Sequence, residues 1–240
     1  IHDMPKTLSK KEGATTAVAV AQPAVGVVGE ITASDLVIPN IRIAHKTGEL
    51  GELFEPGSIV LNGEYALLGC RSDDRENVKE DPVLMTVTSA EKYYKEKIAF
   101  GGEEAPKTAR TLDEVVELGG SLEFGKPNPW IACLKTTVCV KGDDPAFFPF
   151  SYNDETYAFA TLDFGSWSSY NYAGKQILTA SSLSFQDAEK YPHGLAHGSW
   201  ELTTIKRSMK DNTKYWCPAV KSGKINDTEF AEWAATYFAQ

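Results

Sequence analysis

The sequence has few cysteines and histidines, no long apolar run and fewer bases than acids. Its four cysteines, among 240 residues, form no C-x-x-C pair and are too few for a disulfide scaffold. We therefore expect a reducing compartment for Cys70, Cys133, Cys139 and Cys217, and we expect Cys133 and Cys139, six apart in an apolar strand-like run, to be small buried hydrophobic residues. No stretch approaches the ~18 apolar residues of a membrane span, so no membrane partner is expected. A net charge of -9 argues against coating of duplex DNA by bulk charge.

Catalytic motifs are also missing. The chain has no Walker A loop, no Rossmann glycine fingerprint and no nucleophile elbow. His193 and His197 have a spacing that could hold zinc on a helix, but Pro192 and two glycines favour a loop there. We predict a protein that is not an enzyme and holds no metal or cofactor. A small hydrolase that uses His193 or His197 remains a third, less favoured class.

Strand signals dominate the chain from residue 35 onward. Residues 130–141 are a strand candidate because they are rich in Thr and Val, and alternation with period two predicts a strand at 156–164. Asn62-Gly63 between apolar runs predicts a tight hairpin. Short helices are expected at 90–97, after the capping box Thr111–Glu114, and at 166–180. The fold class predicted is mainly β (α+β), an antiparallel OB-like barrel or sandwich with short helices and a C-terminal amphipathic helix.

Three segments are expected along the chain. Residues 1–30, rich in Ala, Val and Thr, are predicted to be an extended N-terminal arm, with a targeting segment as the alternative. Residues 31–225 are the β-rich core domain. Residues 226–240 form a helix with Asn226 and Glu229 as its capping pair, packed on the core or on a neighbour. Self-association is expected through the arm or through this helix.

A basic, aromatic hairpin near the end of the chain is the leading candidate site. Strands at 200–207 and 214–220 flank a turn, and the segment 206–224 holds six basic residues and one acid, Asp211. Cations that follow a phosphate backbone and aromatic rings that stack on bases are typical of single-strand binding. The alternative is a solvated turn whose lysines protect a sheet edge. The candidate nucleic-acid-binding residues are Lys206, Arg207, Lys210, Lys214, Tyr215 and Trp216.

Strand neighbours limit how many of these aromatic rings are available. Tyr215 and Trp216 are adjacent, so they point to opposite faces of the strand and one of them should face the core. We expect at most one of the two rings to stack on a base.

Two stretches resemble proteins of tailed bacteriophages. Residues 35–45, followed by 54–58, resemble a phage pattern of Ile-Pro, alternating apolar residues and Pro-Gly-Asp. The hairpin strands 200–204 and 214–218 are similar to the closing hairpin of phage single-stranded-DNA-binding proteins of OB type. Many members of that family end in an acidic tail, whereas this sequence ends in the amphipathic helix. The resemblance implies a phage-encoded protein, and some phage proteins with the first pattern are particle components.

These observations lead to two competing functions. The first is a phage-encoded, non-enzymatic protein that binds single-stranded DNA in the host cytoplasm through the basic aromatic hairpin. The alternative is a virion structural protein, such as a capsid, decoration or tail subunit, whose arm packs on neighbouring subunits.

Overall fold

The structure is a computed structural model that describes residues 38–98, 105–123, 125–209 and 212–237. They belong to one compact unit, Val37–Gln240. The expected arm, residues 1–30, lies outside the described residues, and so does Lys210.

Strands make up 43% of the structure and helices 21%, which confirms the mainly β class. Within the described residues ten strands form one sheet. They are β1 (Asn40–Ile43), β2 (Ile59–Leu61), β3 (Tyr65–Leu68), β4 (Val83–Glu96), β5 (Thr108–Ala109), β6 (Trp130–Gly142), β7 (Phe150–Tyr152), β8 (Glu155–Phe164), β9 (Gly198–Ser208) and β10 (Lys214–Ile225). The helices are α1 (Glu49–Leu53), α2 (Leu112–Glu117), α3 (Trp167–Ser169), the π-helical η2 (Tyr170–Gly174), α4 (Lys175–Leu183), the 3-10 turn η3 (Gly194–His197) and α5 (Thr228–Thr236).

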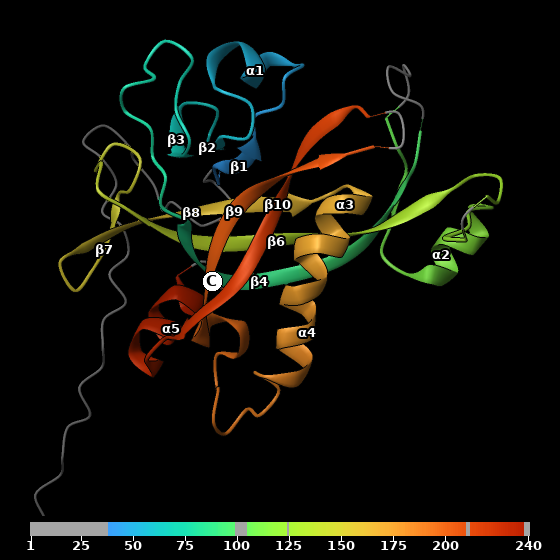
Figure 1. Cartoon of the computed structure of the whole chain (residues 1–240). Coiled ribbons are helices and arrows are strands. Elements are labelled where there is room, and N and C mark those ends of the chain that lie inside the picture. Colours follow the sequence, from blue (N-terminus) through green and yellow to red (C-terminus); the bar gives the residue numbers. More distant parts are fainter. Residues whose placement is uncertain (1–37, 99–104, 124, 210–211, 238–240) are drawn as a thin grey trace, which may run out of the picture. The chain divides into compact units, whose positions relative to one another are not determined.

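The sheet curls into a half-barrel (Figure 1). Its strand order is β10-β9-β4-β6-β8-β1-β2-β3, with β5 paired to β4 and β7 to β8. These pairs are antiparallel, as expected, except that β1 runs parallel to β8. The long strands β4, β6 and β8 form the centre, and the β9–β10 hairpin follows the helical segment 167–183.

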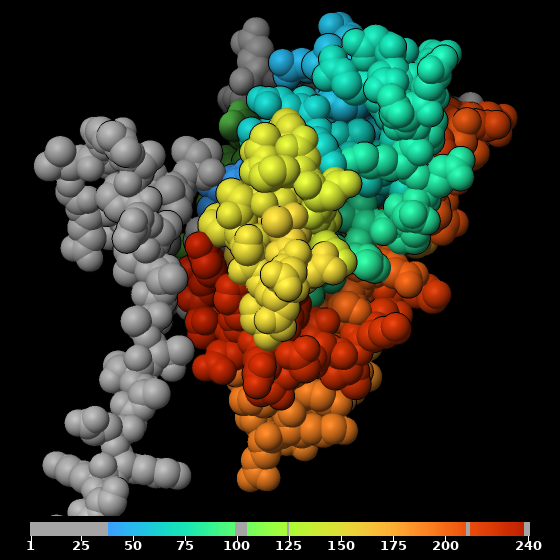
Figure 2. All heavy atoms as spheres, turned by 90° about the vertical axis from the view of Figure 1, so that its left-hand side faces the viewer, coloured from blue at the N-terminus to red at the C-terminus, as the bar shows by residue number. Residues whose placement is uncertain are grey.

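The two faces of the central strands are covered by different helices. On the inner face, Ala173 and Ile177 are fully buried against side chains such as Leu134 and Phe164. On the outer face, α5 covers one end of β6 and β8, and Trp233 contacts Phe159 with ring centroids 5.6 Å apart. Figure 2 shows α5, in red, against the β7–β8 hairpin, in yellow. Beyond α5 the outer face carries polar side chains such as Glu91, Lys135 and Asp163.

Several local expectations are confirmed. Asn62 and Gly63 have φ values of 53° and 76°, as a tight hairpin turn requires. Thr111 caps α2 by accepting a hydrogen bond from the Glu114 amide, 3.2 Å. The helix expected at 166–180 is present, and its middle turn is π-helical. Cys133 and Cys139 are buried as expected, and Cys70 and Cys217 are buried as well; all four are free thiols.

Two local expectations are wrong. Residues 90–97 are not a helix, because β4 runs through to Glu96 and pairs with β6 as far as Trp130. The N-cap of α5 is Asp227, whose carboxylate accepts the Phe230 amide at 2.8 Å, and not Asn226. The Asn226 side-chain amide instead donates to Thr86 and to the Ala196 carbonyl. No helix in the described part of the chain is long and apolar enough to cross a membrane.

Candidate nucleic-acid interface

The β9–β10 hairpin leaves the sheet halfway along its length. Strand β9 pairs with β4 only from Ser199 to Leu202, whereas its pairing with β10 extends to Ser208. Beyond Leu202 the hairpin lies between the turn at Gly57 and the helical segment α3–η2. Thr204 donates a hydrogen bond to the Gly57 carbonyl at 2.7 Å, across 147 residues of sequence. The distal hairpin is therefore positioned by two surfaces, one on each side (Figure 1).

Trp216 faces the Gly57 side. Gly57 has a φ of +99°, and a Cβ placed there would lie 2.7 to 2.8 Å from three atoms of the Trp216 ring. Such distances are below van der Waals contact, so only glycine allows this approach. The Lys206 ammonium lies 5.7 Å from the Trp216 ring centroid. The half-buried indole thus packs within the protein and anchors the hairpin.

Tyr215 and Arg207 face the helix. The Tyr215 hydroxyl is 3.0 Å from the Ser168 hydroxyl on α3. The Arg207 guanidinium lies over the Tyr172 ring, with Cζ 4.2 Å from the centroid, a distance typical of a cation–π contact. Burial raises the pKa of the neighbouring Cys217 thiol, and the Arg207 charge opposes that rise. Both hairpin aromatics therefore have partners within the fold.

Trp167 is the aromatic residue that sequence analysis did not place in the site. It is the first residue of α3, and 59% of it is exposed. Its ring meets Tyr172 edge to face, with centroids 6.3 Å apart. Trp167, Tyr172 and Arg207 thus form a continuous row, which we call the platform. Ser166 and Ser169 fix its start through a capping box.

The platform lies on the basic side of the hairpin. Residues 164–186 contain no acid, and residues 202–225 contain six bases and the single acid Asp211. Lys206, Arg207 and Lys214 are exposed. Joining an acid-free helix to a basic hairpin gives a local positive field on a protein of charge -9.

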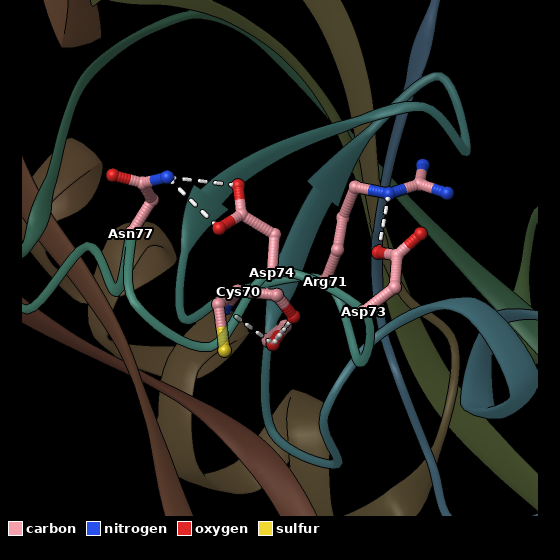
Figure 3. A network of polar contacts seen from close by, with 6 residues as sticks. Cys70, Arg71, Asp73, Asp74 and Asn77 are labelled. Carbon is pink, nitrogen blue, oxygen red and sulfur yellow. Dashed lines mark hydrogen bonds and ion pairs between the residues drawn. The ribbon is translucent and has the colours of Figure 1, made fainter.

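The lobe on the other side of the hairpin has the opposite charge. Residues 46–81 contain nine acids and four bases. Figure 3 shows how the loop at 70–77 pairs its polar groups: Arg71 Nε lies 3.1 Å from Asp73, and Asn77 donates to both carboxylate oxygens of Asp74. Arg75 is 2.6 Å from Glu55. Because acids outnumber bases by nine to four, this lobe presents net negative charge next to the hairpin.

The two histidines do come together. His193 comes just before the turn η3 and His197 ends it, and their rings stack with centroids 5.8 Å apart. His197 is 2% exposed, its Nε2 has no hydrogen-bond partner within the structure, and burial lowers its pKa. No group of three or more His, Cys, Asp or Glu side chains suited to a metal occurs among the described residues.

The platform and the exposed hairpin cations are thus the part of the described surface best suited to an anionic, stackable ligand. Comparisons with protein-family models, curated proteins and solved structures return no match, so the function must be inferred from the residues of this surface.

Proposed function

We propose that this protein binds single-stranded DNA along the platform and the cationic edge of the hairpin. Trp167 stacks on a base, and Lys206, Arg207 and Lys214 contact phosphates. The observation that carries the proposal is the exposed indole of Trp167 beside the Arg207–Tyr172 pair, in a helical segment, residues 164–186, that contains no acid. Tyr215 and Trp216 act as positioning residues, because the Tyr215 hydroxyl contacts Ser168 and the Trp216 ring packs against Gly57.

The energetics of single strands suit this surface. Stacking of one base on an aromatic side chain contributes about 1–3 kcal/mol and does not depend on sequence. Phosphate contacts add a salt-dependent term. The acidic lobe at 46–81 repels a polyanion, so the strand approaches from the helix side of the hairpin. A duplex is disfavoured because its bases are already stacked on one another and cannot reach Trp167.

The order of the strands supports an OB-like core. Three antiparallel strands, β4, β6 and β8, are followed by the helical segment 167–183 and a closing hairpin whose first strand pairs with β4. OB folds bind oligonucleotides with the face of the second and third strands and with the loop of the closing hairpin. The basic tip of β9–β10 occupies that loop position. A phage-encoded protein acting in the host cytoplasm belongs to the same proposal.

The test is a titration with fluorescein-labelled oligo(dT) at two salt concentrations. We expect binding at low salt that weakens as salt is added, with the quenching of tryptophan emission reduced in Trp167→Ala. Loss of one stacked base should weaken binding by about 5- to 150-fold. Arg207→Ala should reduce the salt dependence by about 0.7 in the slope of log K against log salt.

Lys190→Ala is the matched control for Arg207→Ala. Lys190 also lies over a tyrosine, with its ammonium 5.0 Å from the Tyr191 ring, but it is outside the platform. Its removal should leave the affinity unchanged. Absence of binding at low salt, or equal effects of the two substitutions, would refute the proposal.

A virion structural subunit is the second candidate, and exposed apolar side chains on one lobe favour it. Around α2, Val116 is 71% exposed and Leu112 50%, and Leu118 and Leu122 are 44% and 42% exposed. Such a cluster is typical of a protein–protein contact. Mass spectrometry of purified phage particles tests this candidate: a stoichiometric copy set supports it, and absence from particles removes it.

A further inference from the structure

The uncovered half of the outer sheet face contains a pocket apart from the platform. Its volume is about 540 Å³, which lies in the range of small-ligand sites. Glu91 and Tyr93 of β4 and Lys135 of β6 form its floor. Arg110, after β5, and Glu114 of α2 form its rim. The pocket thus combines side chains from the sheet with side chains from the β5–α2 lobe.

The strand register aligns the polar groups of the floor. In the strand register Glu91 lies opposite Lys135, and Lys135 lies opposite Asp163 on β8, so three charged side chains form one row across three strands. Tyr93 extends over this row, and its hydroxyl donates to both oxygens of Asp163, at 2.9 and 2.8 Å. Two bonds to one carboxylate fix the Tyr93 ring, which provides a rigid, half-exposed aromatic surface.

The pocket is balanced in charge and has unused hydrogen-bonding capacity. Lys135 and Arg110 are opposed by Glu91 and Glu114, which favours an uncharged polar ligand over a phosphate. Arg110 Nε and Glu91 are 3.8 Å apart, too far for a short hydrogen bond. Lys135 has no ion pair or hydrogen bond of its side chain within the described part of the chain. A flat ligand with donors and acceptors on its edge matches these groups.

The pocket is close to the platform along the chain. A Cβ at Gly165 would lie 2.9 Å from Asp163 and 3.1 Å from the Lys95 ammonium, so the end of β8 contacts this polar face. Gly165 precedes Trp167 by only two residues.

We propose that this pocket is a nucleobase site, in which Tyr93 stacks on the base while Lys135 and Glu91 hydrogen-bond to its edge. The inference rests on the proposed function where the base belongs to a bound strand. The same chemistry would also accept the base of a free nucleotide, and the two sources are separated by experiment.

Photo-crosslinking with oligo(dT) that carries single 4-thiothymidines tests the site directly, followed by peptide mapping. We expect crosslinks to the peptides that contain Tyr93 or Lys135. Lys135→Ala and Tyr93→Leu should each weaken binding of the oligonucleotide about tenfold. Lys141→Ala is the matched control, since Lys141 is exposed on the same face of β6 but pairs with Glu155 outside the pocket. Lys141→Ala should leave the affinity for the oligonucleotide and the crosslinks unchanged.

The outcomes separate this inference from the proposed function. If Trp167→Ala weakens binding while both pocket variants bind normally and no crosslink maps to the pocket, the nucleobase site is refuted and the platform stands. If the wild-type protein does not bind oligo(dT), the proposed function fails. A second titration with thymidine monophosphate then decides the pocket: saturation that Lys135→Ala abolishes supports a free-nucleotide site, and no saturation refutes it.

Discussion

The contact between Gly57 and Trp216 predicts a large difference between two glycine substitutions. Gly57 and Gly48 have almost the same backbone angle, with φ values of +99° and +103°. A Cβ at Gly48 meets nothing within 4 Å, whereas a Cβ at Gly57 meets the Trp216 ring at 2.7 to 2.8 Å. Both glycines thus carry a backbone penalty for a side chain at positive φ, and only Gly57 carries a steric penalty as well.

The magnitudes follow from these two contributions. A side chain in a φ/ψ region that almost only glycine adopts costs about 1–3 kcal/mol, which is the whole effect expected for Gly48→Ala at φ 103° and ψ 168°. Gly57→Ala should lose that amount and a further ~1–3 kcal/mol, because the half-buried indole must shift to admit a methyl group. The added cost should be absent in a Trp216→Leu background, where the ring is gone. A double-mutant cycle should give a coupling energy of about 1–3 kcal/mol.

Urea unfolding of the four proteins of the cycle and of Gly48→Ala measures these differences. Equal losses for Gly57→Ala and Gly48→Ala would refute the steric account. So would a penalty for Gly57→Ala that persists without Trp216. Because the hairpin carries Arg207, Gly57→Ala should also weaken oligo(dT) binding, whereas Gly48→Ala should not.

Three smaller predictions concern other anchors. Tyr215→Phe removes the hydroxyl that meets Ser168 and should cost about 0.5–1.5 kcal/mol in chemical unfolding. Asp227→Ala removes the cap of α5 and should cost about 1 kcal/mol, with Glu232→Ala, exposed and beyond the first turn, as a control near zero. His197 has a folded-state pKa below its ordinary 6.5 because it is buried, so the unfolded chain binds the proton more tightly. The contribution of His197 to the free energy of unfolding should be fully present above about pH 6.5 and should be lost as the pH drops through that value. In His197→Asn this pH dependence should be weaker. Urea unfolding at a series of pH values measures the difference.

Much of the secondary structure could be predicted because it depends on local signals. Asn62-Gly63 defines its hairpin through backbone preferences of two residues, and the capping box at Thr111 determines where α2 begins. The helix predicted at 90–97 is wrong for the opposite reason. Their alternating Lys and Glu with Ala suit a helix, but pairing with β6 supplies a full ladder of backbone hydrogen bonds. Long-range pairing decided that segment, and no local pattern reports it.

The candidate site likewise has one feature that the sequence predicts and others that only the fold reveals. The positive charge of the hairpin is visible in the sequence, since it depends only on composition. The exposure of Trp167 is not, because it depends on where α3 lies relative to the sheet and the hairpin. The absence of acids from residues 164 to 186 was a usable signal, and it pointed to the same surface. The partner of Trp216 is also hidden, because Gly57 is far away in the chain.

A hairpin that leaves its sheet needs cover on both faces, and this requirement explains where the stacking residues can be. Trp216 takes its cover from the Gly57 turn and Tyr215 from α3, so the two rings that look suited to bases stabilise the hairpin instead. The hairpin cations Lys206, Arg207 and Lys214 stay exposed and can meet a ligand. If the protein binds single-stranded DNA as proposed, the surface that stacks bases lies beside those cations, and the start of α3, with Trp167 exposed next to Arg207 and Tyr172, is in that position.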